Sequence, residues 1–304
     1  MSSRVAPVRA LLPKLASALR DFTSSPSTFR IVHSVRPTGS VQPPKTLYIL
    51  DSSFNPPSVA HMSLATSALN RHDSKTTQPC YLLLLFSTHN ADKAPSPASF
   101  EHRLAMMTLF AEDLQSAIQR TANQSPSPRE DISIDIGLTK APYYTDKTAA
   151  ISTAQPNPYP SKPIHVHLIG FDTVTRLLAS KYYPDHQPPL SALSPYFEGG
   201  HKFLVTIRPS DPNDASSATY GTADQQINYI DGLVQGSLEE EGFKRNWAGQ
   251  VDRLIGQEGI GVSSTRIRKA AQGQDWYELQ KLCTPGVAAW VKEMGLYGQN
   301  PKTE

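Results

Sequence analysis

Cysteine, net charge and long apolar runs are all scarce in this sequence. Two cysteines in 304 residues exclude a disulfide framework and a four-thiolate zinc site, so we expect free thiols and a reducing compartment such as the cytoplasm or the nucleus. The 29 basic residues nearly balance the 27 acidic ones, which excludes a globally basic nucleic-acid-binding surface. No apolar run approaches the ~18 residues of a membrane span. We therefore expect neither nucleic acid nor membrane as a partner.

Proline, by contrast, is abundant. The chain has 26 prolines, 38% hydrophobic residues and 18% charged residues, a composition that predicts long loops around a core of ordinary size. The length alone allows two domains at about 150 residues each. We expect one large domain over residues 46–298, with insertions near 121–130, 152–162 and 209–258 and a tail at 299–304.

Residues 1–45 form a separate N-terminal segment with seven basic residues and a single acid, Asp21. A mitochondrial transit peptide, which is basic, serine-rich and poor in acids, fits that composition. A structural helix followed by a short edge strand over 29–32 fits as well, because apolar residues recur at helical spacing; they are Leu11, Leu12, Leu15, Leu19 and Phe22. We favour the helix, docked on the main domain and retained in the mature protein.

After Pro44 the sequence alternates between short apolar runs and longer segments with helical spacing. The expected strands are 47–50, 80–86, a half-buried strand over 132–136, 164–169, 202–207 and 260–263. The expected helices are 59–69, 99–118, a short helix from 173, 264–272, 275–283 and 285–294. Such alternation predicts an α/β fold with a doubly wound parallel sheet. Ligands of these sheets bind at the carboxyl ends of the strands.

The segment Ser52–His61, with the sequence SSFNPPSVAH, lies between the first expected strand and its helix. Backbone amides and a helix N-terminus at such a turn favour an anion. Ser58 and His61 share one face of the helix, and His61 can donate to a phosphate oxygen or, when protonated, offset developing charge. The alternative is that Ser58 only caps the helix and that His61 is an ordinary packed histidine.

The segment Val262–Arg268, with the sequence VSSTRIR, ends an expected strand and opens a helix. The hydroxyls of Ser263, Ser264 and Thr265, together with the exposed amides of the first turn, would form a phosphate cradle. Arg268 follows one turn later and can bind phosphate through its planar guanidinium. The alternative is an ordinary hydroxyl cap with solvated arginines.

Together, the two segments resemble the signature motifs of the nucleotidyltransferase superfamily, GxFxPxHxGH and SSTxxR. The chain is most similar to nicotinamide mononucleotide adenylyltransferases, and the run 50–57 resembles a divergent fungal branch of that family. Further similar segments are 88–93, 100–107, 143–148, 168–172, 203–209 and 285–297. The first motif departs from the family pattern, because Ser52, Ser58 and Ala60 stand where Gly, His and Gly are usual.

The resemblance implies a Rossmann-like enzyme that joins ATP and nicotinamide mononucleotide to give NAD and pyrophosphate. It implies Mg²⁺ carried by the substrate phosphates, no metal site on the protein, and His61, Ser58 and Arg268 as catalytic residues. The implied ATP contacts are Ser53, Phe54, Ser58, His61, Arg208, Ser263, Ser264, Thr265 and Arg268. The implied contacts of nicotinamide mononucleotide are Asn55, Lys93, Tyr144, Thr145, Gly170 and Asp172.

Two other functions stay open at this level. A cytidylyltransferase of the same superfamily would use CTP and a phosphorylated alcohol, and a nucleotide-binding regulator would bind without transferring a group. Nicotinamide and nicotinate mononucleotide share their ring and phosphate, so the sequence does not separate them. The oligomeric state is equally open.

Three further residues have competing interpretations. Arg103, in the helix over 99–118, is expected at the helix surface or in an ion pair. His165 and His167 alternate along a strand and face one side of it, as a pair of metal ligands would. Because no third ligand is evident, we expect them to be core or cleft-wall histidines.

Overall fold

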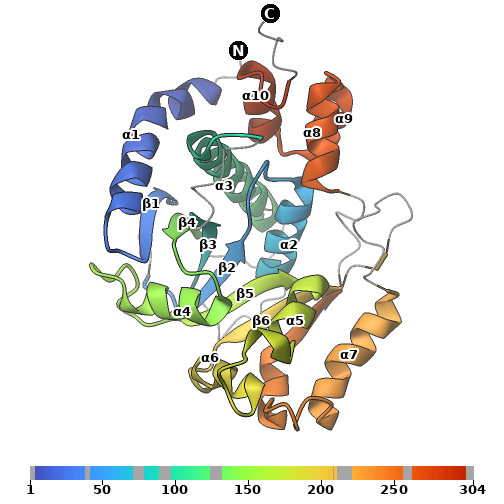
Figure 1. Ribbon diagram of the computed structural model, residues 1–304. Coiled ribbons are helices and arrows are strands. Elements are labelled where there is room, and N and C mark those ends of the chain that lie inside the picture. The colour runs from blue at the N-terminus through green and yellow to red at the C-terminus, as the bar shows by residue number, and fades with distance from the viewer. Residues whose placement is uncertain are drawn as a thin grey trace, which may run out of the picture.

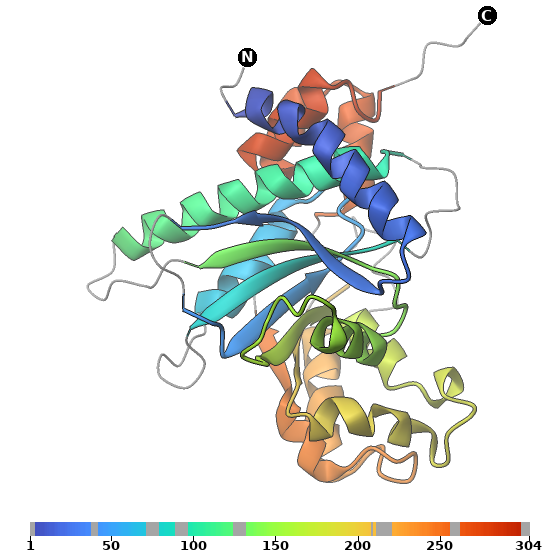
Figure 2. The same cartoon turned by 90° about the vertical axis from the view of Figure 1, so that its left-hand side faces the viewer.

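A seven-stranded sheet runs through the molecule and is covered by helices on both faces (Figures 1 and 2). The computed structural model describes residues 4–37, 42–70, 79–88, 97–123, 132–207, 209–210, 221–255 and 262–298. The strands are β1 (Phe29–Val35), β2 (Thr46–Asp51), β3 (Cys80–Ser87), β4 (Ser133–Thr139), β5 (Ile164–Gly170), β6 (Lys202–Ile207) and β7 (Val251–Ile255).

The strand order is β1-β4-β3-β2-β5-β6-β7. All neighbouring pairs are parallel except β1 with β4, which is antiparallel. Without β1, the order is that of the doubly wound sheet with two mononucleotide-binding halves, whose strands follow 3-2-1-4-5-6. The predicted α/β class with a Rossmann-like parallel sheet is therefore confirmed.

Each face of the sheet buries its own set of helices. One face packs against α1 (Val5–Ser24), α2 (Val59–Asn70), α3 (Phe100–Asn123), α8 (Ser264–Gln272), α9 (Trp276–Leu282) and α10 (Pro285–Glu293). The other packs against α4 (Tyr144–Thr153), α5 (Phe171–Leu177), α6 (Ser194–Glu198) and α7 (Ala223–Gln235). Because β2 and β3 are covered on both sides, most residues of these strands are apolar and buried.

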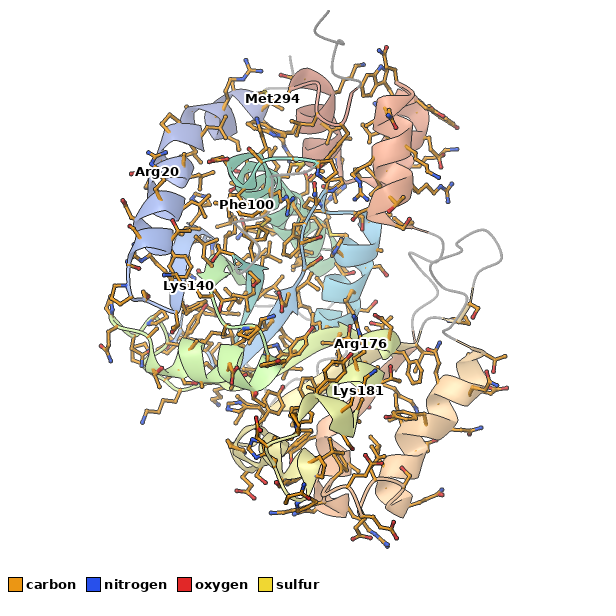
Figure 3. The ribbon with its side chains drawn as sticks, in the orientation of Figure 1. Arg20, Phe100, Lys140, Arg176, Lys181 and Met294 are labelled. Atoms are coloured by element: carbon orange, nitrogen blue, oxygen red, sulfur yellow. The ribbon has the colours of Figure 1, made fainter. Side chains whose placement is uncertain are left out.

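The N-terminal segment contains the expected helix and edge strand. Leu15, Leu19 and Phe22 of α1 are buried in the same core as α3, while Arg20 lies on the outer side of the helix (Figure 3). The following strand, β1, covers the edge of β4, and the absence of a side chain at Gly137 admits the Phe29 ring, which a Cβ there would meet at 2.8 Å. Retention of the segment in the mature protein stays a prediction.

Two expectations about strands were wrong. The strand over 132–136 was expected to be half-buried, yet all of β4 is buried. The polar residue Asp135 is satisfied internally, because its carboxylate accepts hydrogen bonds from Ser34 at 2.6 Å and Tyr159 at 2.8 Å and pairs with Arg36 at 2.8 Å. In β4, the polar residue that alternates with isoleucines therefore faces a buried hydrogen-bond network and not solvent.

The last strand also differs from expectation. It is β7 at Val251–Ile255, within the region 209–258 that was expected as an insertion. Val262 and Ser263 have no strand structure, and the remainder of the expected strand over 260–263 lies outside the described residues. Asp252 and Arg253 interrupt the apolar pattern of β7, so the sequence pattern does not indicate a strand there. The strand is defined by its parallel pairing with β6. Among the helices of the described ranges, none has the length and apolarity to span a membrane.

We predict that Phe22→Ala destabilises the fold, because this side chain is fully buried between α1 and the rest of the core. Truncating a buried Phe typically costs about 3–5 kcal/mol, measurable as the free energy of unfolding in urea. Lys14→Ala, on the exposed side of the same helix, should change it by less than about 0.5 kcal/mol. Equal, small effects of both variants would show that α1 is not an integral part of the fold.

Candidate active site

The site lies where the strand order reverses. The chain leaves β2 toward α2 on one face of the sheet and leaves β5 toward α5 on the other, although β2 and β5 are parallel neighbours. In doubly wound sheets, this divergence places the ligand crevice at the carboxyl ends of the two strands. The turn over 52–58 follows β2 directly and borders that position.

His61, on the first turn of α2, is held at both ring nitrogens. Ser58 donates its backbone N–H to Nδ1 at 3.0 Å, and its hydroxyl lies 2.8 Å from the same nitrogen. Since an N–H donates to Nδ1, the neutral ring carries its proton on Nε2, which lies 2.9 Å from the Ser52 hydroxyl. The predicted shared face of Ser58 and His61 is confirmed by these contacts.

Burial lowers the pKa of His61 to about 4, because an imidazolium is poorly solvated there. At neutral pH the imidazole is therefore uncharged and acts as a hydrogen-bond donor rather than as a cation. Ser58 contacts both the ring and the backbone of His61. It is buried, and it immediately precedes α2. Besides its contact with Nδ1, its hydroxyl accepts a long hydrogen bond from the His61 amide at 3.4 Å.

The first turn of α8 is fastened to the turn after β2. Ser264 donates to the Pro56 carbonyl at 3.3 Å, and Arg268 donates from one terminal nitrogen to the Asn55 carbonyl at 2.9 Å and from the other to the Thr265 hydroxyl at 3.0 Å. Ser263 is the N-cap, accepting from the Arg266 amide. The two sequence motifs, more than 200 residues apart, thus form one surface with a helix N-terminus at its edge.

Phe54 and Ser53 are neighbours on the turn after β2, but Phe54 is buried and Ser53 is exposed. The Phe54 ring is fully buried, 5.4 Å from the His61 ring centroid, so any contact with ATP must come from its backbone. That backbone has a φ of 46°, uncommon for a bulky residue, and it shapes the turn that carries the amides. Ser53 is exposed at the same turn.

Tyr297, near the C-terminus, is a site residue that the sequence did not single out. Its hydroxyl donates to the Asn55 side-chain oxygen at 2.8 Å, so Asn55 is held through its side chain by Tyr297 and through its carbonyl by Arg268. Burial is the main reason that the pKa of Tyr297 is raised. The phenol thus remains a neutral donor, and the only sequence signal was its place in the segment 285–297.

Arg103 was expected at a helix surface or in an ion pair, and the first of these was wrong. The residue is buried, donates from Nε to the Ala98 carbonyl at 3.0 Å, and lies over the Phe100 ring at 5.1 Å from its centroid. Burial lowers its pKa, which Tyr297 raises and Arg268 lowers further. Two guanidinium groups, from α3 and α8, therefore act on each other near Tyr297, an arrangement that an anion would stabilise.

On the other side of the crevice, Tyr144 opens α4. Its ring packs edge-on against His167 at 5.1 Å and Phe203 at 5.9 Å between centroids. Burial, and then the charge of Asp51, raise its pKa. Thr145 is half-buried on the same turn. Tyr144, His167 and Phe203 thus form an aromatic wall on the face of the sheet, over the middle of β5 and the start of β6.

Gly170 and Asp172 lie at the end of β5. Gly170 is the N-cap of α5, and a Cβ at this position would lie 2.7 Å from an Asp172 carboxylate oxygen. Asp172 pairs with Arg176 at 2.9 Å one turn later, and Figure 3 shows Arg176 on that helix. The carboxylate therefore belongs to an exposed ion pair at the rim.

Two of the predicted contacts, Lys93 and Arg208, lie outside the described residues. Within the described ranges, no three His, Cys, Asp or Glu side chains are arranged to hold a metal ion. His165 and His167 are buried, as expected for core histidines. His167 Nε2 lies 2.9 Å from the Thr148 hydroxyl, and His165 stacks on His201 with centroids 4.7 Å apart.

Comparison with known proteins gives one strong similarity. The chain is 29% identical over 286 residues to a Schizosaccharomyces pombe protein that carries the provisional name nicotinamide mononucleotide adenylyltransferase, covering 93% of this chain and 97% of that protein. The resemblance inferred from the motifs thus extends along nearly the whole chain. No protein-family model matches.

Similar solved structures are more distant. A Plasmodium falciparum nicotinic acid mononucleotide adenylyltransferase complexed with APC aligns with a TM-score of 0.45 and 13% identity, over 83% of this chain and 97% of that one. A Vibrio parahaemolyticus structure named as a nicotinate-nucleotide adenylyltransferase gives a TM-score of 0.32 and 13% identity, over 82% and 99% of the two chains. The strand order alone identifies the fold as Rossmann-like.

We predict that acid destabilises the fold partly through His165. Burial and the nearby His201 lower its pKa to about 3, whereas an unfolded histidine titrates near 6.5. Its contribution to stability is therefore complete above about pH 6.5 and is lost as the pH falls toward the folded value. Between pH 7 and pH 5, removing this titration in His165→Leu should reduce the acid-induced loss of unfolding free energy by ~2 kcal/mol.

The measurement is urea unfolding at both pH values, and the matched control is His186→Ala, which removes an exposed histidine. The control should keep the wild-type pH dependence. If His165→Leu also keeps it, the histidine is not held neutral by burial.

Proposed function

We propose that this chain transfers the adenylyl group of ATP to nicotinamide mononucleotide, producing NAD and pyrophosphate. The observation that carries the proposal is the joining of the two motifs at the switch point of the sheet. His61 is held there as a neutral donor beside the N-terminus of α8 and the Arg268 guanidinium. The similarity to the S. pombe protein, whose provisional name gives the same activity, supports it.

In the proposed reaction, a phosphate oxygen of nicotinamide mononucleotide attacks the α-phosphorus of ATP in line. A new P–O bond forms as the bond to the β-phosphate oxygen breaks, and the electron pair leaves with pyrophosphate. No covalent enzyme intermediate is needed. Positioning of the reactants and stabilisation of charge supply the catalysis, and Mg²⁺ enters with the phosphates of ATP as part of that substrate.

Each half of the site has its own task in this scheme. His61 Nε2–H turns from Ser52 to an α-phosphate oxygen, while Ser58 fixes the ring from the Nδ1 side. The α8 amides, Ser264, Thr265 and Arg268 hold the distal phosphates, where buried cationic charge from Arg103 adds to that of Arg268.

The acceptor nucleotide occupies the other side of the crevice. The Tyr144 face suits a cationic pyridinium ring, and Thr145, Gly170 and Asp172 lie at the starts of α4 and α5 on the same side. From the resemblance, Asn55 would contact this nucleotide from the turn after β2. From the resemblance alone, Lys93 would bind the phosphate of this nucleotide and Arg208 would contact ATP.

One observation favours a second candidate, a nucleotide-binding regulator without transfer activity. The Ser52 hydroxyl occupies the Nε2 side of His61, and a substrate phosphate must displace it. Product analysis with ATP or CTP and a panel of monophosphates separates the candidates. NAD from ATP and nicotinamide mononucleotide supports the proposal, a cytidylyl product indicates the cytidylyltransferase, and binding without any product indicates the regulator.

We predict that His61→Ala lowers kcat for NAD formation by about 10²–10³-fold, corresponding to about 2.7–4 kcal/mol in the barrier. The expected cause is the loss of a hydrogen bond that strengthens as charge develops on the α-phosphate. Urea unfolding establishes that the variant is folded, and His186→Ala is the matched histidine control, because His186 is exposed. A wild-type rate for His61→Ala would leave this histidine with a structural role alone.

We predict that Arg268→Ala weakens binding of ATP more than binding of nicotinamide mononucleotide. Loss of a charged hydrogen bond costs about 1.5–3 kcal/mol, or roughly 10- to 100-fold in Kd, measurable by calorimetry. Arg268→Lys should rescue only part of it, because the planar fork is lost. Arg266→Ala, on the exposed side of the same helix, is the control. An equal loss for both ligands would contradict the assignment.

A further inference from the structure

A buried ion pair lies beside the aromatic wall of the crevice. Lys147, on the first turn of α4, donates from its ammonium group to the carboxylate of Asp51, the last residue of β2. The side chains are 8% and 10% exposed. Burying two charges is costly even when they are paired, and an apolar pair of similar size is often as stable. The position of this pair therefore calls for an explanation beyond stability.

The pair is next to Tyr144. The Lys147 ammonium lies 5.0 Å from the centroid of that ring, and the Asp51 charge is close enough to contribute to the raised pKa of Tyr144. Asp51 is also directly followed by Ser52, which contacts His61. The two charges thus stand between the aromatic wall and the turn after β2, at the carboxyl end of the sheet.

A pyridine ring bound at Tyr144 would bring its substituent within range of these charges. A carboxamide substituent is neutral and has N–H groups that can donate to a carboxylate oxygen. A carboxylate substituent has no donor and carries a negative charge, which Asp51 repels. Lys147 would attract such a carboxylate, but its charge is already neutralised by Asp51 within the pair.

We propose that the Asp51–Lys147 pair makes the site select the pyridine mononucleotide with a neutral carboxamide over the one with a carboxylate. The inference rests on the proposed function and deepens it, because it assigns the substrate choice to two named residues. Asp51 acts as the acceptor for the carboxamide and as the group that keeps Lys147 from receiving a carboxylate. Discrimination here comes from an unfavourable charge contact as much as from a favourable hydrogen bond.

The test compares kcat/KM for nicotinamide and nicotinate mononucleotide, each with ATP, in wild type, Asp51→Asn and Lys147→Gln. We expect wild type to prefer the nicotinamide form. Asp51→Asn leaves the ammonium available to a carboxylate and should lower the preference by at least about tenfold, whereas Lys147→Gln leaves the carboxylate unneutralised and should raise it. A pair with a structural role alone would lower both activities together and leave their ratio unchanged, which would overturn the proposal.

Opposite shifts from the two variants are the distinguishing signature. Lys244→Gln breaks an exposed ion pair with Glu198 and should leave the ratio unchanged. Arg176→Gln tests the neighbouring pair with Asp172; if it moves the ratio while Lys147→Gln does not, the carboxylate is sensed by Arg176 and the proposal is wrong.

Folding and function are checked separately. If a single variant does not fold, the double variant Asp51→Asn/Lys147→Gln removes both charges and should lose most of the preference, while a wild-type ratio there overturns the inference. If wild type makes no dinucleotide from either substrate, the proposed function fails. If it makes both and the ratio is insensitive to Asp51 and Lys147, only the further inference fails.

Discussion

The docking of α8 onto the turn after β2 is the contact on which the candidate site depends. Two backbone carbonyls of that turn, Asn55 and Pro56, accept from Arg268 and Ser264. Without this contact, the helix N-terminus and His61 would belong to separate surfaces. Ser264 and Arg268 therefore have a structural role, because the hydrogen bonds that hold the turn also fix the position of its amides.

Residues near both ends of the chain stabilise the helices and the turn around this contact. The Asp113 carboxylate in α3 accepts from Arg4 at 2.6 Å and from the Gly286 amide at the start of α10 at 2.8 Å. One buried acid thereby ties the N-terminal helix and the C-terminal helix to the longest helix of the core. Tyr297, which follows α10, then reaches Asn55. The two termini thus stabilise the same face of the sheet that carries the first motif.

Low polarity around the ionisable groups gives the site its chemical character. His61 stays neutral, Arg103 is a buried cation, and Asp51 and Lys147 form a shielded pair. Charges and dipoles interact more strongly in such surroundings than in water. A ligand that entered the site would therefore encounter a fixed pattern of donors and charges.

By itself, the sequence determined the alternation of strands and helices, the doubly wound class and the positions of the two motifs that we expect to bind anions. Each of these depends on local patterns: continuous apolar runs in β3, helical spacing in α1, and hydroxyls before a helix in α8. The hydrophobic pattern gave wrong predictions where polar residues are buried within a strand or interrupt it. Asp135 made β4 look half-exposed, and Asp252 and Arg253 obscured β7, because their environment is set by neighbours distant in sequence.

Only the tertiary structure decided how the site is completed. The bond from Tyr297 to Asn55, the pairing of Lys147 with Asp51 and the burial of Arg103 join segments that lie far apart along the chain. No local spacing encodes such contacts, since they arise from the order of the strands and the packing of helices on each face. The motifs predicted which two segments bind phosphate, and the fold decided which charges surround those segments.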